Sequence, residues 1–350
     1  MNIFRVRLAP SRIVALTLLN LLFLGLCACD SGPLIDLALN PPGRKPIDNL
    51  QIGVNNFFVD REFGSISEQY SDIRDNIRIP YVRVLLAWTN GVQPSPSSEP
   101  DFGFFDSILD SVPAGVDVLV VVAHTPDWIT DPSNWVDGNP RLTWVKRWLE
   151  PVVLRYRGNG RIVGFEVCNE PDVTTVPSDV ALGIENPDDY AELLTFASNS
   201  IRALAPGKLV VMAATTSIQQ NFPTTLQYNQ RLQQLGIENL IDVWNIHYYG
   251  KSFESVVTQN GVADFLNGLI LPIWVTESGE QGPDQQLEYV ETVWPFLVDK
   301  VSGIQRFYYY QYSSPAPAPD NFGLRTSDPA FPVSDLYIFL RDQRGRSQGA

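Results

Sequence analysis

Short apolar runs recur along this chain at a spacing of roughly 35 residues, which is the length of one strand-and-helix unit in an α/β barrel. The sequence contains eight such runs: Gln51–Val54, Tyr81–Trp88, Val116–Ala123, Ile162–Val167, Leu209–Ala214, Val243–Tyr249, Ile273–Thr276 and Ile304–Tyr310. β-Branched and aromatic residues fill most of them, as in parallel strands that are buried on both faces. Segments with helical apolar spacing lie between the runs, at Leu142–Tyr156, Asp188–Leu204, Asp284–Val298 and Val333–Leu340.

Eight alternating strand and helix units predict an α/β fold, namely a closed (β/α)8 TIM barrel in one domain of residues 47–345. An open, doubly wound sheet is the alternative. The closed barrel is favoured because no glycine-rich phosphate-binding loop follows any of the runs. A hydrophobic content of 44% is enough for the large core that such a barrel needs.

The first 28 residues carry the features of a bacterial lipoprotein signal peptide. Arginines at positions 5, 7 and 12 precede a leucine-rich stretch, Ile13–Leu26, which is short for a membrane span. The stretch ends in Leu26-Cys27-Ala28-Cys29, which resembles the lipobox, and this resemblance implies cleavage before Cys29 and acylation of its thiol. A secreted protein without lipid and an uncleaved membrane anchor are the alternatives.

Residues 29–46 contain several prolines and glycines, and we expect them to tether the following domain to a bacterial membrane, on its periplasmic side. Asp30 resembles the signal that retains some lipoproteins at the inner membrane, so the inner membrane is the finer expectation. Once Cys27 is removed and Cys29 is acylated, only Cys168 remains as a free thiol, which excludes an intramolecular disulfide.

The net charge of −14 argues against nucleic acids and anionic surfaces as partners. An aromatic content of 11% is instead a mild indication of a carbohydrate partner. The two histidines are far apart and match no metal-binding spacing, so we expect neither a metal nor another cofactor. We also expect a monomer.

The strongest chemical signal lies in Arg161–Val173, RIVGFEVCNEPDV, where a buried run ends in two polar residues. Pro171 cannot donate a backbone hydrogen bond and favours an extended Glu170, so the strand should end there. A carboxylate at the carboxyl end of a barrel strand lies where α/β barrels build their active sites. For this segment alone, a Glu170 that only binds loop backbone is the alternative.

A second carboxylate, Glu277, ends the seventh run. With Glu170 at the end of the fourth run, both glutamates should open on the same face from opposite sides of the barrel. These motifs make the chain resemble the clan A glycoside hydrolases, nearest to families 39 and 5, over residues 48–342. The segments that carry the resemblance are VCNEPD, NIHYYG (Asn245–Gly250), PIWVTESG and NFGL (Asn321–Leu324).

This resemblance implies a retaining glycosidase in which Glu170 is the acid/base and Glu277 is the nucleophile. Two carboxyl groups about 5 Å apart permit such a double displacement, whereas inversion needs room for a water molecule between them. We expect the pair to titrate apart, with the proton on Glu170, in the more apolar surroundings, and with an ionised Glu277.

Arg83 is a charge inside the second apolar run, and a buried arginine needs an anion, for which Glu277 is the obvious candidate. An outward-facing Arg83 that pairs with a helix carboxylate is the alternative. The resemblance implies that Asn169 hydrogen-bonds the sugar 2-hydroxyl and that Tyr249 lies near the nucleophile.

The histidines His124 and His247 follow the third and sixth runs, and we expect them to contact or orient the sugar, with a purely structural role as the alternative. Trp88, and with it Trp128 and Trp135, could stack on sugar faces. Four other tryptophans fall within helix or strand patterns and should belong to the core: Trp144, Trp148, Trp244 and Trp294.

The eighth run departs from the resemblance, because many relatives have a tryptophan at its end as a floor for the reacting sugar. This chain offers Tyr310 there, together with Tyr308, Gln311 and Tyr312. The family and the sugar that binds therefore stay open.

The sequence as a whole predicts a membrane-tethered retaining glycoside hydrolase that acts on an oligo- or polysaccharide. Aromatic residues spread along the rim favour endo action weakly. A barrel that binds glycans without cleaving them, or a lipoprotein of an envelope assembly, is the alternative from another class. Transglycosylation through the same intermediate is a third possibility.

Overall fold

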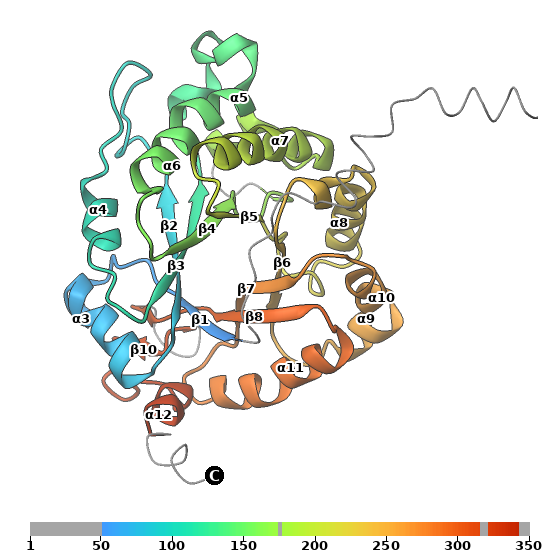
Figure 1. Ribbon diagram of the computed structural model, residues 1–350. Helices are drawn as coiled ribbons and strands as arrows, with labels where there is room; N and C mark the ends of the chain where they lie inside the picture. Colours follow the sequence, from blue (N-terminus) through green and yellow to red (C-terminus); the bar gives the residue numbers. More distant parts are fainter. Residues whose placement is uncertain (1–50, 174–176, 316–320, 343–350) are drawn as a thin grey trace, which may run out of the picture. The chain divides into compact units, whose positions relative to one another are not determined.

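Eight parallel strands form one sheet that curls into a barrel, with the helices around its outside (Figure 1). The strands of this computed structural model are β1 (Gln51–Asn55), β2 (Tyr81–Ala87), β3 (Asp117–Ala123), β4 (Ile162–Val167), β5 (Leu209–Met212), β6 (Trp244–Tyr249), β7 (Ile273–Gly279) and β8 (Ile304–Tyr309). Each strand coincides with one of the eight predicted runs. The structure describes residues 51–173, 177–315 and 321–342.

The barrel closes between β5 and β6, where the pairing is sparse. Val211 and Val243 form a single parallel bridge, and the Asp242 N–H donates to the Val210 carbonyl over 2.8 Å. All other neighbours, including β1 and β8, pair as parallel strands in sequence order around the circle, with register shifts between β3 and β4, β6 and β7, and β7 and β8. The predicted (β/α)8 TIM barrel is therefore confirmed, and the open doubly wound sheet is wrong.

The outer layer consists of short and medium helices that follow the strands. They are α3 (Ile66–Ser71), α4 (Gly103–Leu109), α5 (Pro140–Trp144), α6 (Glu150–Tyr156), α7 (Pro187–Leu204), α8 (Thr224–Gln234), α9 (Glu254–Gln259), α10 (Val262–Asn267), α11 (Gln286–Lys300) and α12 (Asp335–Asp342). A small parallel pair, β9 (Ser313–Ser314) and β10 (Arg325–Thr326), lies in the loop after β8.

The helix predicted for Leu142–Tyr156 contains a π-helical bulge just before Pro151. A π-helical turn over Val145–Leu149 joins α5 to α6, and the Glu150 N–H donates to the Val145 carbonyl. Proline has no N–H to donate and its ring clashes with the carbonyl four residues earlier. The wider π-helical turn accommodates both effects within the helix. The helix therefore continues through the proline.

The predicted tryptophan core is present. Trp144, Trp148 and Trp244 are fully buried, and Trp294 is nearly so. Trp88 belongs to this core too: its ring stacks on that of Trp148 with centroids 6.1 Å apart, and its Nε1 donates to Gln93 over 2.8 Å. With no exposed surface, Trp88 cannot act as a sugar platform, so that prediction is wrong.

Apolar side chains fill the base of the barrel interior. Trp274 and Tyr308 pack there in a separate cluster, and Gly53 makes room for them, because a Cβ on Gly53 would lie 2.4 Å from the Tyr308 ring. The guanidinium of Arg306 lies over the rings of Tyr81 and Trp274, at 3.5 and 4.1 Å from their centroids. Among the described residues, the cavity that Arg83, Leu85 and Val121 line from inside the barrel lies toward the carboxyl ends of the strands.

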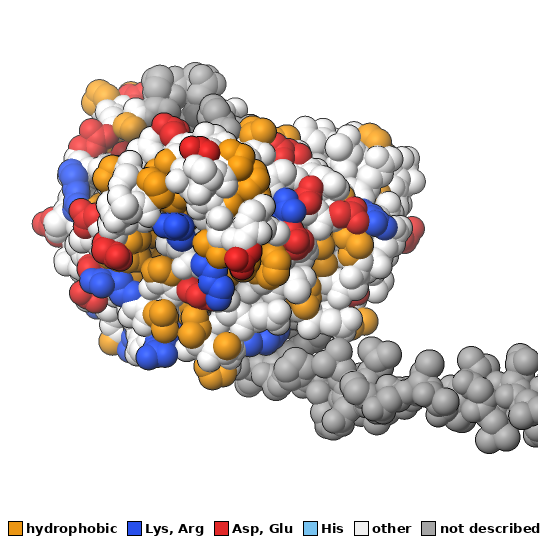
Figure 2. Space-filling view, turned by 90° about the horizontal axis from the view of Figure 1, so that it is seen from above, with side chains coloured by type: hydrophobic (Ala, Val, Ile, Leu, Met, Phe, Trp, Pro, Cys, Tyr) orange, Lys and Arg blue, Asp and Glu red, His pale blue; other side chains and the backbone are white. Residues whose placement is uncertain are grey.

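On the face of the molecule shown in Figure 2, acidic and basic side chains are interspersed with apolar ones. Pairs such as Arg231 with Asp188, 2.5 Å apart, neutralise one another locally. Within the described part of the chain, no helix combines the length and the apolar character that a membrane crossing requires. The predicted signal peptide (1–28) and tether (29–46) lie outside the described residues.

Candidate active site

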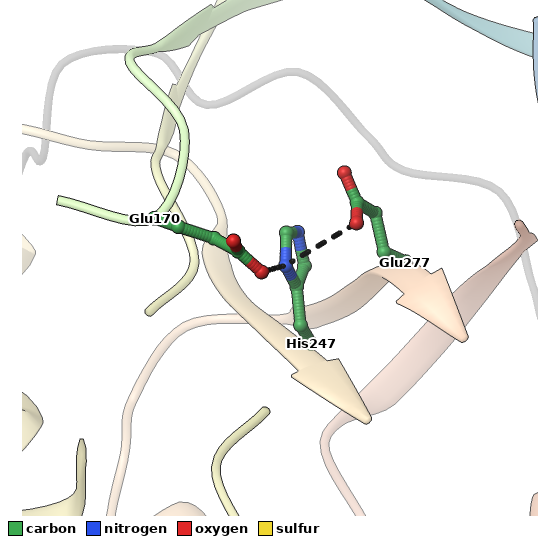
Figure 3. A group of neighbouring side chains, drawn as sticks. All are labelled: Glu170, His247 and Glu277. Atoms are coloured by element: carbon green, nitrogen blue, oxygen red, sulfur yellow. Dashed lines mark hydrogen bonds and ion pairs between the residues drawn. The ribbon is translucent and has the colours of Figure 1, made fainter. Parts of the chain in front are cut away.

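Two carboxylates face each other at the carboxyl ends of β4 and β7 (Figure 3). Glu170 comes from the loop directly after β4, and Glu277 lies near the end of β7. One carboxylate oxygen of Glu170, one of Glu277 and a ring nitrogen of His247 all lie within 4.8 Å of one another. The expected pair of glutamates is therefore assembled, with the ring of His247 between them.

The backbone that presents Glu170 is not extended as predicted. Glu170 has φ of 43° and Cys168 has φ of 70°, both in the left-handed region that costs a non-glycine residue roughly 1–2 kcal/mol. The Glu170 N–H donates to the Ala214 carbonyl beyond β5 over 3.0 Å, which holds this conformation. Strain of this kind is common where the chain must aim a functional side chain.

Glu277 is nearly buried and accepts hydrogen bonds on both oxygens. Arg83 Nη1 donates to Oε1 over 2.5 Å, and the Tyr249 hydroxyl donates to Oε2 over 2.7 Å. Burial by itself raises the pKa of Glu277, but the charges of His247 and Arg83 and the hydrogen bond from Tyr249 outweigh it, so the pKa lies below its ordinary value. The site therefore holds Glu277 ionised.

Arg83 lies inside the barrel on β2 and uses all five of its N–H groups. Nε and Nη2 donate to the two oxygens of Glu166, each over 2.8 Å. The other three hydrogens go to Asn55 (2.9 Å), Asn169 (2.7 Å) and Glu277 (2.5 Å). Burial lowers the pKa of Arg83, but the carboxylates outweigh it and raise the pKa. The outward-facing alternative is wrong, since only 4% of the Arg83 side chain is exposed.

Sequence reasoning missed Glu166. It lies on β4, is fully buried, and also accepts from Asn245 Nδ2 over 3.0 Å. The sequence held a signal for it, because Glu166 is a charged residue within the apolar run IVGFEV, just as Arg83 is a charged residue within the second run.

His247 lies within β6 rather than after it, and it contacts the carboxylates. Its Nδ1 is 2.8 Å from Glu170 Oε1 and 3.6 Å from Glu277 Oε2. Its Nε2 is buried and has no hydrogen-bond partner in the described part of the chain, so a proton is better placed on Nδ1, where it can be donated. Burial lowers the pKa of His247, but Glu277 and Glu170 outweigh it and raise the pKa. The arrangement suits orientation of the glutamates more than sugar contact.

His124 stands at the rim directly after β3. Its Nδ1 is 3.0 Å from Asp179 Oδ2, and the Thr125 hydroxyl donates to Asp179 Oδ1 over 2.7 Å. With Nδ1 held by Asp179, the other ring nitrogen of His124 is available to a bound molecule.

A cavity of about 230 Å³ opens above these groups. It is lined by Phe57, Arg83, Leu85, Val121, His124, Asn169, Glu170, Glu277 and Tyr310. Six of the predicted site residues therefore line this cavity, whereas Trp88, His247 and Tyr249 do not. The apolar lining residues Phe57, Leu85 and Val121 were not predicted. Tyr310 stands at the end of β8, edge-on to Phe57 at 6.0 Å and to Tyr249 at 5.9 Å, and burial raises its pKa to about 12.

The surroundings of the two glutamates differ from the expectation. Glu170 has 27% of its side chain exposed and Glu277 only 10%, so Glu277 is the more deeply buried carboxylate. Its ionisation comes from Arg83, Tyr249 and His247 rather than from water. The prediction that Glu170 lies in the more apolar surroundings is therefore wrong.

The same three donors, Glu170, His247 and Glu277, are close enough to hold a metal ion. The donor chemistry fits poorly, because Arg83 places a cation 2.5 Å from Glu277. A metal on His247 Nδ1 would also move its proton to the buried Nε2. The geometry suits proton sharing better.

Comparison with known proteins identifies the family of this chain and structures that share its fold. The family model "Cellulase (glycosyl hydrolase family 5)" matches residues 45–311. A family 39 glycoside hydrolase from Bacteroides cellulosilyticus WH2 has a TM-score of 0.61 at 17% identity, over 83% of this chain and 62% of that one. A monomeric β-xylosidase from Caulobacter crescentus CB15 has a TM-score of 0.61 at 17% identity, over 86% and 69%.

An endo-1,4-β-mannanase from Rhizomucor miehei has a TM-score of 0.60 at 15% identity, over 84% of this chain and 96% of that one. At such identities these structures share the fold alone, and the chain spans less than two thirds of the family 39 protein's length. No curated protein sequence matches the chain. The family model covers most of the barrel, and the chain therefore belongs to the cellulase family, glycosyl hydrolase family 5.

Proposed function

We propose that this enzyme is a retaining glycosidase with Glu277 as the nucleophile and Glu170 as the acid/base. The observation that supports the proposal is the approach of the two carboxylates to within 4.8 Å. Retaining enzymes hold their carboxyl groups about 5–5.5 Å apart, whereas inverting enzymes need about 6.5–9.5 Å to admit a water.

In the first step, a Glu277 oxygen attacks the anomeric carbon while Glu170 gives its proton to the glycosidic oxygen. The bond between that oxygen and the anomeric carbon breaks, and the leaving group departs as an alcohol. In the second step, Glu170 takes a proton from water, whose oxygen replaces Glu277 on the sugar. Arg83 and Tyr249, which hold Glu277 ionised, support the first step.

We propose that Asn169 donates to the sugar. Its Oδ1 accepts from Arg83 over 2.7 Å, so its two amide hydrogens are available on the side of the cavity that Asn169 lines. A hydrogen bond to a sugar hydroxyl that strengthens in the transition state would contribute several kcal/mol in this reaction class.

The substrate that we propose is a neutral oligo- or polysaccharide. Arg83 is the only cation among the described residues that line the cavity, and its five N–H groups are already used. A uronate or sulfate group would therefore lie beside Glu170 and Glu277 without a free counter-charge. The mannanase and β-xylosidase relatives make β-1,4-mannan and β-xylosides suitable first substrates.

We further propose that the enzyme works outside the cytoplasm, with residues 1–28 removed, Cys29 acylated, residues 29–46 as a tether and residues 47–345 as the catalytic domain. The lipobox-like LCAC sequence supports this placement. The inner membrane is the proposed site because of Asp30.

The test is turnover of neutral aryl β-glycosides and of a glycan panel. Glu277→Gln should lower turnover by at least about 10⁴-fold, since the nucleophile is lost. Glu170→Ala should keep the first step on substrates with good leaving groups and should recover turnover with azide, which needs no general base.

Glu280→Gln, three residues beyond the nucleophile, is the matched control and should keep wild-type turnover. Near-normal turnover by Glu277→Gln, or an inverted anomer as the first product seen by NMR, would refute the assignment. Products longer than the hydrolysis products would identify transglycosylation. Binding of the glycan panel without any cleavage would identify a binding protein.

A further inference from the structure

Glu166 is a third carboxylate in the barrel, and it does not line the cavity. It is fully buried on β4, and each of its oxygens accepts from Arg83 over 2.8 Å. Asn245 Nδ2 donates to Oε1 over 3.0 Å. A buried carboxylate costs several kcal/mol of folding free energy unless its partners compensate fully. Apolar side chains of similar volume would fill the same space in the barrel without this cost.

The contact of Glu166 with Arg83 determines where the rest of the guanidinium points. Glu166 binds one edge of the planar group, formed by Nε and Nη2. Because the five N–H directions are fixed relative to one another, the remaining hydrogens then face Asn55, Asn169 and Glu277. Two of these three acceptors, Asn169 and Glu277, line the cavity.

Asn245 and Asn55 hold this assembly in place from the neighbouring strands. The side chain of Asn245 accepts from the hydroxyl of Thr276 over 2.8 Å, directly before Glu277. The amide of Asn55 donates to the carbonyl of Thr276 over 2.9 Å. The strand end that carries Glu277 is thus tied to the same network as Glu166.

We propose that Glu166 is a positioning residue for the reaction: it aims Arg83 at Glu277 and Asn169, and its charge balances that of Arg83. This inference rests on the proposed retaining function. Without Glu166, the full charge of Arg83 would act on Glu277, which would then remain ionised but would be a weaker nucleophile. With a shorter acidic side chain at position 166, Arg83 would be drawn away from Glu277 and Asn169.

Several titratable or charged groups act on Glu277, and the test must separate Glu166 from them. They are Arg83 on β2, His247 and Tyr249 on β6, Glu170 after β4 and Tyr310 after β8. Of these groups, only Arg83 contacts Glu166 directly, so a change in the acid limb of the pH profile of kcat/KM in variants of Glu166 reports on Arg83 and Glu166.

Two variants should move this acid limb in opposite directions. Glu166→Gln removes the balancing charge, so the limb should shift down by about 0.5–1 pH unit. Glu166→Asp keeps the charge but shortens the side chain, so Arg83 should recede from Glu277 and the limb should shift up. Both variants should lower kcat/KM by about 10–100-fold, mostly through kcat, because a displacement of a positioning group by about 1 Å can slow a reaction by about that much.

Asp242→Asn is the matched control. Asp242 is also a buried carboxylate, it accepts from the Val210 N–H over 2.8 Å and pairs with Arg202, and it does not touch the network around Arg83. It should lower the melting temperature without moving the limb. An acid limb that stays at its wild-type position in both folded Glu166 variants would overturn the proposal. If Glu166→Gln does not fold, Glu166→Asp, which keeps the charge, decides the question by itself.

Failure of this inference is distinguishable from failure of the proposed function. A 2-deoxy-2-fluoro glycoside should label Glu277 covalently in the wild-type enzyme, as seen by peptide mass spectrometry. Labelling together with unmoved limbs would overturn only the role of Glu166. Labelling of another residue would overturn the assignment of Glu277 as the nucleophile, and the absence of any covalent label would count against the retaining mechanism.

Discussion

The charge of Glu277 is set by its neighbours and not by contact with water. Only 10% of its side chain is exposed, and burial alone would favour the protonated form. His247, Arg83 and Tyr249 together reverse this preference and lower its pKa. Activity that needs an ionised Glu277 should therefore persist as the pH falls, until it reaches this lowered pKa.

Tyr249→Phe tests this balance at a single atom, because it removes only the hydroxyl that donates to Glu277 over 2.7 Å. Loss of a hydrogen bond to the ionised form raises the pKa of Glu277, so the acid limb of kcat/KM should move to higher pH. A hydrogen bond to a charged group contributes about 1.5–3 kcal/mol, so kcat/KM at its optimum should fall about 10-fold or more.

Tyr248→Phe is the control for this change. Tyr248 is the preceding residue on β6, is buried, and packs in the core between barrel and helices. It should leave the acid limb where it is in the wild type. A limb that moves equally in both variants would contradict the role given to the Tyr249 hydroxyl.

At the scale of the elements, alternation along β2 separates the core from the site. Val82, Val84 and Leu86 belong to the large core cluster. Tyr81 belongs to the cluster in the barrel interior, whereas Arg83 and Leu85 line the cavity. A strand with period two can therefore carry a charged residue within an apolar run without exposing it.

Gly53 on β1 shows how tightly the interior elements fit. Gly53→Ala would place a Cβ 2.4 Å from the Tyr308 ring, which must then move within a packed layer. Overpacking of this kind costs about 1–3 kcal/mol, so the free energy of unfolding in urea should fall by that amount. Gly158→Ala, where no atom lies within 4 Å of the added methyl, should change it by less than about 0.5 kcal/mol. Equal effects of the two substitutions would contradict this packing argument.

At the scale of the whole molecule, the barrel brings together groups that are far apart in the chain. Arg83 and Glu277 are 194 residues apart in sequence and 2.5 Å apart in space. Residues on or shortly after six of the eight strands, β1, β2, β3, β4, β7 and β8, line the same cavity. Substrate contacts can then vary in the loops while the barrel keeps the carboxylates in place.

The proposed lipid anchor is also a property of the whole molecule. Cys29→Ser removes the thiol to be acylated, so the protein should leave the membrane fraction and become soluble, as measured by fractionation and immunoblotting. Cys27→Ser keeps a small residue at the position two before Cys29 and should stay in the membrane fraction. A Cys29→Ser protein that remains membrane-bound would support an uncleaved anchor.

The sequence by itself determined the eight strands, the closed barrel and the two glutamates at the strand ends. These features are local: apolar runs at a regular spacing define the strands, and Pro171 or the Ser-Gly pair after Glu277 marks where a strand ends. The pairing of Arg83 with Glu277 was also predictable, since a charge in an apolar run needs an anion.

Only the tertiary structure decided which side chains fill the site. The burial of Trp88 against Trp148, the position of His247 between the glutamates and the contact of Glu166 with Arg83 depend on packing between strands. The left-handed backbone at Glu170 depends on its hydrogen bond to Ala214 beyond the next strand. Spacing along one chain specifies which face of a strand a residue occupies, but distances across the barrel follow only from its closure.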